Sequence, residues 1–238
     1  MERETDIGVY ILASGKQTRY ENPQSKLLAD VHGKPAFSYL MNTLLAIFPE
    51  ENISIASSNL FSDFNNWVND TYPRANFLIG DEAGTGTANT LKKSFPWGIE
   101  PNFVTEADIY YDIDLVRGLI KVWNNSPKAK ACIGVSPLVH VAPTHRQIEI
   151  NPNLIIYSHN DDDVKTQEYR NIGAYILSGD VENYIRDDTQ NIVDVIGLMI
   201  LGGEIVVPYI YSEILLHIAE LRDVEKWREY FSNSSVNP

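Results

Sequence analysis

The chain has 238 residues, of which 44% are hydrophobic, and its formal net charge is -13. This length and composition exclude wholesale disorder and allow one large domain with a core of its own. The acidic balance repels the phosphates of nucleic acids, so we expect no nucleic-acid partner.

The N-terminal segment does not resemble a targeting or membrane segment. The stretch MERETDIGVYILASG carries charges and only a short apolar run, which is too short and too acidic for a signal peptide. No window approaches the roughly 20 apolar residues of a membrane span. Cys132 is the one cysteine, which excludes a disulfide within the chain, and its apolar surroundings favour a buried side chain over a catalytic thiol. We therefore expect a cytoplasmic protein with no membrane partner.

Strands alternate with helices over the first half of the chain. The stretch GVYILA at residues 8–13 is continuously apolar, as in a strand covered on both faces. Further strands are expected at residues 53–58, 75–80 and 102–108, and helices at residues 36–48, 61–72, 84–95 and 113–125. A short strand and turn are expected at residues 27–35. This alternation predicts an α/β fold with a doubly wound, mainly parallel, Rossmann-like sheet.

The second half changes character. Successive strands are expected at residues 130–137, 145–151, 154–160, 171–179 and 203–211, and helices at residues 180–187, 192–201 and 221–231. Strands that follow one another without helices predict a smaller antiparallel section that extends the sheet. The acidic run at residues 161–163 favours a solvated turn over a metal site, because three adjacent side chains cannot all face one ion. We find no internal linker and expect a single domain over residues 1–238.

A polar loop follows the first strand. It contains Lys16, Arg19 and Lys26, three cations within eleven residues of an otherwise acidic protein. Ser14 and Gly15 at its start can present backbone N–H groups at the carboxyl end of the strand, where open α/β sheets bind ligands. This pattern indicates a phosphate-binding loop. The alternative is a solvated loop whose cations face neighbouring acids.

The stretch LASGKQTRYENPQSKLLADVHGKPAFSYLMNTL resembles the opening signature of nucleotidyltransferases that couple a nucleoside triphosphate to a sugar 1-phosphate or a similar phosphorylated alcohol. That signature reads approximately L-A-[AG]-G-x-G-T-R, then P-K-x-L, then G-K-P. Gln17 stands in place of its second glycine and Ser25 in place of the proline before its lysine. The matching residues are Leu12, Ala13, Gly15, Thr18, Arg19, Lys26, Gly33, Lys34 and Pro35.

Two later stretches continue the resemblance. GTGTANTL resembles a G-T-A-x-x-L segment that puts Gly86 and Thr87 beside the nucleotide, although Thr87 also suits a helix cap. NFVTEADIYYDIDL resembles the strand that ends in the family's metal-binding aspartate, here Asp108, with Glu106 as an additional acid. The alternative is that these acids cap the following helix, a role that Asp112 suits better than Asp108.

The C-terminal half carries weaker matches. NIGAYILS resembles a segment whose Asn171 and Gly173 would contact the acceptor substrate, and Lys165 lies where the family often has a lysine for the acceptor phosphate. HIAELRDVEKW resembles the region of the second metal-binding aspartate, although its Gly-Thr-Pro is absent. We take Asp223 as that residue, with Glu220 as the alternative register and a surface ion pair at a helix start as the other interpretation.

The resemblance implies a GT-A-type fold, with a nucleotide-binding half at residues 1–125 and an acceptor-binding half at residues 126–238. It implies transfer of a nucleoside monophosphate from a triphosphate to a phosphorylated sugar or alcohol, with release of pyrophosphate. Arg19, Lys26 and Asp108 would be catalytic, and Asp108 and Asp223 would hold Mg²⁺. The implied nucleotide-binding residues are Leu12, Ala13, Ser14, Gly15, Lys16, Gln17, Thr18, Gly86 and Thr87. The oligomeric state stays open, a homo-oligomer included.

Two other functions fit part of the pattern. A glycosyltransferase that uses a nucleotide sugar would share the fold and an acid pair on a metal, but it does not need a loop that holds a triphosphate. A non-catalytic nucleotide-binding or regulatory domain would explain the departures at Gln17 and Ser25 and the missing Gly-Thr-Pro.

Overall fold

The computed structural model describes most of the chain. The described residues are 7–15, 17, 19–80, 86–94, 101–137, 147–150, 156–158 and 168–233. Lys16, Thr18, Lys165 and the acidic run at residues 161–163, all named above, lie outside them.

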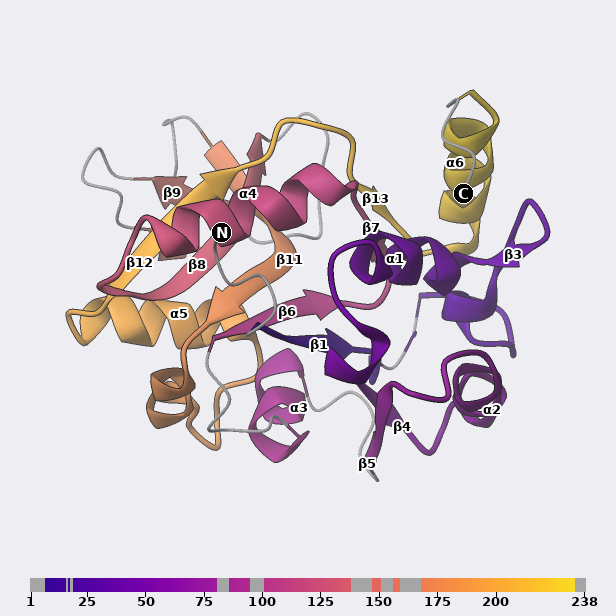
Figure 1. Ribbon diagram of the computed structural model, residues 1–238, viewed down its shortest axis with the longest axis horizontal. Coiled ribbons are helices and arrows are strands. Elements are labelled where there is room, and N and C mark those ends of the chain that lie inside the picture. The colour runs from indigo at the N-terminus through magenta and orange to yellow at the C-terminus, as the bar shows by residue number, and fades with distance from the viewer. Residues whose placement is uncertain are drawn as a thin grey trace.

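Four parallel strands from the first half form one side of a sheet that has nine strands within the described residues (Figure 1). Their order is β6, β1, β4 and β5. The strands are β1 (Gly8–Leu12), β4 (Ile53–Ser58), β5 (Asn76–Gly80) and β6 (Asn102–Glu106). Leu12 lies opposite both Ala56 and Glu106, so β1 ends level with β6, while β4 continues to Ser58. The predicted parallel sheet is confirmed.

The antiparallel section comes from the second half, as predicted. Its long strand β11 pairs antiparallel with β6, β8 and β9, and β12 joins the far side of β8 in parallel. A bulge interrupts the pairing of β11 with β8 between Asn171 and Tyr175. The strands are β8 (Ala129–Pro137), β9 (Gln147–Ile150), β10 (Ile156–Ser158), β11 (Glu168–Leu177) and β12 (Ile205–Ile210).

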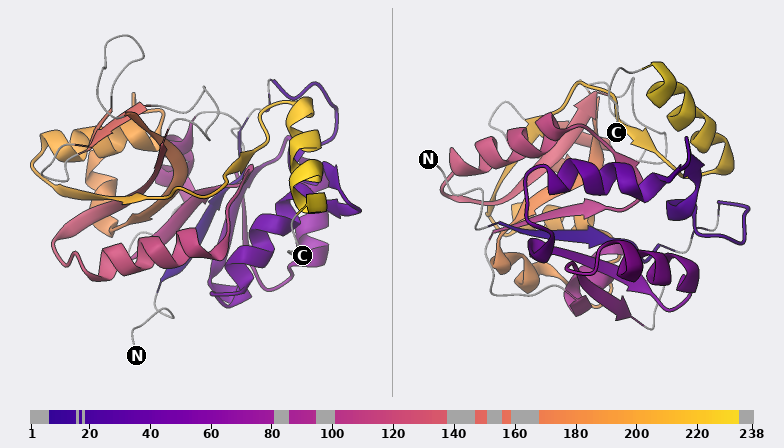
Figure 2. Two further views of the ribbon diagram at one scale, coloured as in Figure 1. Left: turned by 90° about the horizontal axis from the view of Figure 1, so that it is seen from above. Right: turned by 45° about the vertical axis from the view of Figure 1, so that its right-hand side comes forward.

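Helices cover both faces of the sheet (Figure 2). Alternate side chains of β1 point to opposite faces, as the twofold period of a strand requires. Val9 and Ile11 pack with α1, α2 and α4, whereas Tyr10 and Leu12 pack with α3 and α5. The helices are α1 (Ala36–Leu45), α2 (Ser62–Thr71), α3 (Thr87–Ser94), α4 (Ile113–Asn124), α5 (Ile192–Leu201) and α6 (Leu221–Asn233). None of the helices among the described residues is long and apolar enough to cross a bilayer.

Short elements complete the fold. The predicted strand and turn near residue 30 is a hairpin of β2 (Asp30–Val31) and β3 (Lys34–Pro35), whose turn places Gly33 at a φ of 80°. The helix predicted at residues 180–187 is instead a 3₁₀ helix, η5 (Gly179–Tyr184), a common form for a connector this short. Two further 3₁₀ turns are η2 (Lys26–Leu28) and η3 (Glu50–Asn52).

The sequence did not predict a second small ladder that reaches the carboxyl end of β6. Strand β7 (Ile109–Tyr110) pairs antiparallel with β13 (Leu216–His217), so that His217 lies opposite Ile109. Helix α6 follows directly and packs its aromatic residues against Tyr39 and Tyr110. A C-terminal segment is thereby fixed beside the end of the central sheet.

Candidate active site

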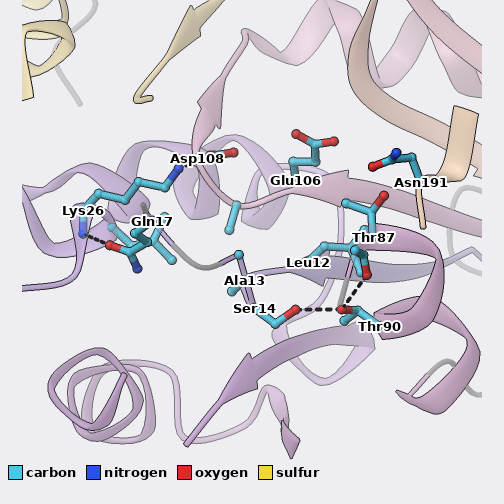
Figure 3. Close-up of a pocket in the computed structure, with 14 residues that line it drawn as sticks. Leu12, Ala13, Ser14, Gln17, Lys26, Thr87, Thr90, Glu106, Asp108 and Asn191 are labelled. Atoms are coloured by element: carbon cyan, nitrogen blue, oxygen red, sulfur yellow. Dashed lines mark hydrogen bonds and ion pairs between the residues drawn. The ribbon is translucent and has the colours of Figure 1, made fainter. Parts of the chain in front are cut away.

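A cavity of about 260 Å³ opens where the polar loop leaves β1 (Figure 3). Ser14 begins the loop, and its hydroxyl shares a 2.7 Å hydrogen bond with the hydroxyl of Thr90 on α3. This contact ties the loop to the helix that follows Gly86, whose φ is 99°. Every nucleotide-binding residue predicted within the described chain lines the cavity, namely Leu12, Ala13, Ser14, Gly15, Gln17, Gly86 and Thr87.

The two departures from the nucleotidyltransferase signature contact each other. The Gln17 side chain donates to the Ser25 hydroxyl at 3.1 Å and accepts from the backbone N–H of Lys26 at 2.7 Å. Gln17 also keeps a left-handed backbone with a φ of 53°, a conformation that costs a non-glycine residue about 1 kcal/mol. Ser25 uses an N–H that proline lacks to donate to Asp63 at 3.0 Å. The substituted residues therefore form a brace that fixes the backbone of Lys26.

We expect the Gln17→Ala variant to bind nucleoside triphosphate about tenfold more weakly, because the Lys26 N–H loses its acceptor. Isothermal titration calorimetry measures this affinity. Gln24→Ala is the matched control, since it makes the same chemical change on an exposed side chain of the same loop. An equal loss in both variants, or none in Gln17→Ala, would contradict the positioning role of Gln17.

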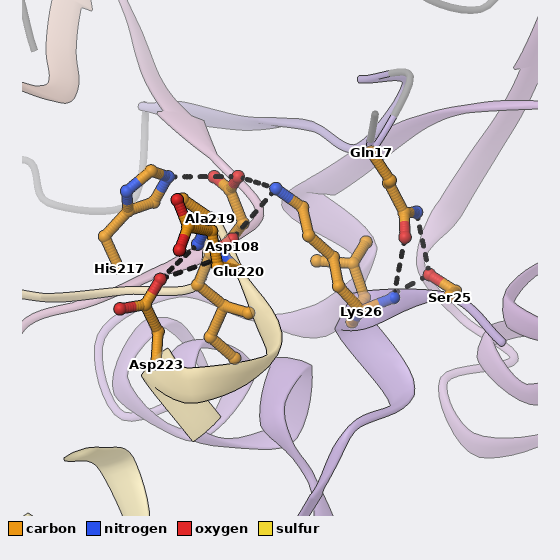
Figure 4. A network of polar contacts seen from close by, with 10 residues as sticks. Gln17, Ser25, Lys26, Asp108, His217, Ala219, Glu220 and Asp223 are labelled. Atoms are coloured by element: carbon orange, nitrogen blue, oxygen red, sulfur yellow. Dashed lines mark hydrogen bonds and ion pairs between the residues drawn. The ribbon is translucent and has the colours of Figure 1, made fainter. Parts of the chain in front are cut away.

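Asp108 lies just past the end of β6 and is the centre of a charged network (Figure 4). Its Oδ2 atom forms an ion pair with the Lys26 ammonium and lies 3.2 Å from Nε2 of His217. Burial by itself would raise the pKa of Asp108, but the charges of Lys26 and His217 outweigh burial and hold this pKa well below its usual range. Asp108 is therefore an anion in the free protein. It does not cap a helix, because Asp112 caps α4 by accepting from the N–H of Asp114 at 2.9 Å.

His217 reaches this network through the β7–β13 ladder. The backbone N–H of Ile218 donates to the carbonyl of Asp108 at 2.9 Å, and the carbonyl of Ile218 accepts from the Lys26 ammonium at 3.0 Å. The sequence analysis did not select His217. The signal available was a polar residue within the apolar run from Leu215 to Ile218, close to the region assigned to the second metal-binding aspartate.

Asp223 has a different environment. One oxygen of its carboxylate accepts from the backbone N–H groups of Ala219 at 3.0 Å and Glu220 at 2.9 Å, at the start of α6. Its other oxygen accepts from Lys226 at 2.8 Å. These contacts make Asp223 the acidic member of a helix cap. Although burial opposes ionisation, the Lys226 and backbone hydrogen bonds lower the pKa of Asp223.

None of these contacts joins Asp223 to Asp108. Asp223 lines neither the cavity after β1 nor a second cavity that adjoins it. Within the described residues no cluster of three or more His, Cys, Asp or Glu side chains could hold a metal ion. Asp223 as a metal ligand stays a prediction.

A second cavity of about 390 Å³ adjoins the first. It is lined by the predicted residues Arg19, Asn171 and Gly173, and also by His217. Asn171 stabilises the bulge of β11 by accepting from the N–H of Gly173 at 3.0 Å. The residues that line both cavities are Thr87, Glu106, Asp108 and Asn191.

Glu106, the last residue of β6, lines both cavities, and its carboxyl group lies beside Gly173 of β11. A side-chain carbon at Gly173 would come within 3.0 Å of the Glu106 carboxyl carbon, so the glycine provides the room that this carboxyl group occupies. Burial and the nearby charge of Asp108 raise the pKa of Glu106 to about 7, against the opposing effect of His217 and Lys26. Near neutral pH a large share of Glu106 is therefore uncharged, which lowers its repulsion of an anionic ligand.

Comparisons with known proteins bear on the fold. No protein-family model matches the chain, and no curated protein matches it. A solved structure from Bacillus anthracis, assigned as a glucose-1-phosphate thymidylyltransferase and bound to sucrose, is 17% identical, with a TM-score of 0.77 over 98% of both chains. The chain has the nucleotidyltransferase fold.

Two further structures share this nucleotidyltransferase fold. The inositol-1-phosphate CTP transferase from T. maritima is 16% identical, with a TM-score of 0.74 over 95% of this chain and 96% of that chain. HddC from Yersinia pseudotuberculosis in complex with GMP-PN is 21% identical, with a TM-score of 0.69 over 94% of this chain and 99% of that chain. At these identities the likeness establishes the fold alone.

Proposed function

We propose that the protein transfers a nucleoside monophosphate from a nucleoside triphosphate to a phosphorylated sugar or similar alcohol and releases pyrophosphate. The observation that carries the proposal is the pair of adjoining cavities with Asp108 and Glu106 in their common wall. A two-substrate transfer needs two such sites in contact. The names of the similar structures, a thymidylyltransferase and a CTP transferase, support the reaction class.

The first cavity is proposed as the nucleotide site and the second as the acceptor site. The loop after β1 and the start of α3 line the first cavity, and both can present backbone N–H groups to phosphate. Arg19, Asn171 and Gly173 line the second cavity, which offers one cation and one amide to a phosphorylated, hydroxyl-rich molecule. We also keep the cytoplasm as the proposed location.

The proposed reaction brings two anions together. An oxygen of the acceptor phosphate forms a bond to the α-phosphorus of the triphosphate, and the bond from that phosphorus to the pyrophosphate oxygen breaks. The attacking phosphate is already ionised, so no side chain has to remove a proton. Catalysis then consists of alignment and neutralisation, in which Lys26 and Arg19 hold phosphate charge from the sides of the two cavities.

We propose that the protein binds Mg²⁺ together with the triphosphate. The Lys26 ammonium lies on Asp108 Oδ2 and the carbonyl of Ile218, two hard oxygen atoms that suit such an ion. When bound, the cation would supply positive charge that offsets the charge of the phosphates. Asp108 is the proposed carboxylate ligand.

A panel assay tests this function. The purified protein is incubated with each nucleoside triphosphate and each of a set of sugar 1-phosphates and phosphorylated alcohols, and pyrophosphate is measured. We expect release only when one particular triphosphate and one class of acceptor are present together. Nucleotide binding without any pyrophosphate would favour the non-catalytic domain, and hydrolysis or transfer from a nucleotide sugar would favour the glycosyltransferase.

A further inference from the structure

The carboxyl group of Glu106 lies in the wall of the second cavity. Figure 3 shows it pointing away from Ala13 and Ser14 of the loop after β1. The absence of a side chain at Gly173 leaves room for it on the side of β11. Within the described residues this carboxyl group makes no hydrogen bond and no ion pair. A partly buried acid that the protein leaves unpaired is available to a bound molecule.

The neighbouring basic groups are directed at a different carboxylate. The Lys26 ammonium forms an ion pair with Asp108 Oδ2, and His217 Nε2 lies 3.2 Å from the same oxygen. Burial and the charge of Asp108 outweigh these two bases and raise the pKa of Glu106. The protein therefore does not offset the negative charge that Glu106 carries when ionised.

The polar side chains of β11 beside Glu106 do not supply the missing partner either. The Asn171 amide donates to the Tyr175 hydroxyl at 2.6 Å and accepts from the backbone N–H of Gly173 at 3.0 Å. These hydrogen bonds hold the bulge of β11 in shape. They fix the wall beside Glu106 and leave its carboxyl group facing the cavity.

We propose that Glu106 binds an ammonium group of the acceptor, so that the acceptor is a phosphorylated amino alcohol or amino sugar. The proposal rests on the proposed transferase function for the phosphate of this acceptor and on the position of Glu106 for its ammonium group. Arg19 is exposed and lines the same cavity, so it can hold the phosphate. The second cavity thus offers one group of each charge to a molecule that carries both.

An ammonium group suits this carboxyl group better than a hydroxyl group does. A hydroxyl can donate a hydrogen bond to the carboxylate but leaves its charge in place, and an unpaired charge is costly in a partly buried position. An ammonium donates hydrogen bonds and also offsets the charge, and such charge-assisted bonds are about twice as strong as neutral ones. We therefore expect Glu106 to select acceptors that carry an amine over acceptors that carry a hydroxyl at the same place.

Two pairs of ligands test this selection, and the members of each pair differ by one group. Phosphoethanolamine is compared with ethylene glycol monophosphate, and glucosamine 1-phosphate with glucose 1-phosphate. Isothermal titration calorimetry measures their affinity for the full chain in EDTA, with and without a saturating non-hydrolysable nucleoside triphosphate. We expect the amine of at least one pair to bind about tenfold more tightly than its hydroxyl counterpart.

Glu106→Gln keeps the size of the side chain and removes its charge. This variant should bind both members of the pair about equally, so the preference of about tenfold is lost. The matched control is Glu51→Gln, the same change in a side chain that is 60% exposed beside Arg74, and it should keep the preference. Circular dichroism and thermal unfolding show whether each variant is folded. The comparison of ligands on wild type needs no variant, so the selection is tested even if Glu106→Gln does not fold.

Three results would overturn the proposal. Equal affinity within both pairs on wild type would favour a neutral sugar or alcohol as the acceptor. A preference that persists in folded Glu106→Gln would place the ammonium at another group. An effect of Glu106→Gln that appears only when Mg²⁺ replaces EDTA would assign this carboxyl group to the metal.

These measurements are independent of turnover. A protein that releases no pyrophosphate can still prefer the amine of each pair, and that result would count against the proposed transferase function alone. A protein that releases pyrophosphate with a neutral acceptor and shows no preference would count against the role of Glu106 alone.

Discussion

Asp108→Asn is expected to lower the rate of pyrophosphate release about 10³-fold. The variant keeps the size of the side chain but removes the anion that faces both Lys26 and His217. A neutral amide holds a divalent cation much less tightly than a carboxylate does, and the Lys26 ammonium loses its counter-ion. The measurement is steady-state pyrophosphate release with the best substrate pair from the panel assay.

The matched control is Asp112→Asn, which makes the same chemical change at the cap of α4. We expect this variant to keep nearly the same free energy of unfolding, because asparagine caps a helix about as well as aspartate, and to retain turnover. If Asp108→Asn were folded and retained a rate within about tenfold of wild type, the assignment of Asp108 to the reaction would be wrong.

Lys26→Met is expected to lower the same rate about 10²-fold. The reason is that the proposed reaction needs the ammonium beside the phosphates, and a methionine side chain carries no charge. Lys26→Arg should restore only part of the rate, because a planar guanidinium cannot replace a compact ammonium in a side-chain position that is 12% exposed.

Lys92→Met serves as the control for Lys26, since Lys92 forms a 2.9 Å ion pair with Asp187 at the surface. Loss of a surface ion pair costs little, so its rate should match wild type. A rate for Lys26→Met as close to wild type as that of Lys92→Met would contradict the role of the Lys26 ammonium in the reaction.

The spacing of apolar residues along the sequence was sufficient to predict most of the fold. The strand at Gly8–Leu12 is apolar on both faces because helices cover both faces, and a continuous apolar run is the direct sequence expression of that environment. Helices such as Ile113–Asn124 were found because their apolar residues repeat at helical spacing and an aspartate precedes them. The loop after β1 was recognisable because three cations lie within eleven residues of an otherwise acidic chain.

Contacts between distant segments were not predictable in this way. His217 meets Asp108 across 109 positions, through a two-residue strand that has no periodicity of its own. Asp223 was selected because HIAELRDVEKW resembles the region of the second metal-binding aspartate. That likeness could not reveal that its carboxylate accepts from the N–H groups of Ala219 and Glu220 at the start of α6.

The brace between Gln17 and Ser25 was also hidden from the sequence. Each residue taken alone departs from the signature and suggests a weakened phosphate loop. The structure joins them by a side-chain hydrogen bond, and both hold the backbone next to Lys26. The two departures in this motif therefore contact each other, which the sequence alone does not reveal.

The most direct test of the account is a crystal structure with a non-hydrolysable nucleoside triphosphate and Mn²⁺. The account predicts the polyphosphate in the cavity after β1, with the Lys26 ammonium on phosphate oxygens and the anomalous signal of manganese within coordination distance of Asp108. A nucleotide bound away from this loop, or Lys26 still paired with Asp108 beside a bound triphosphate, would contradict it.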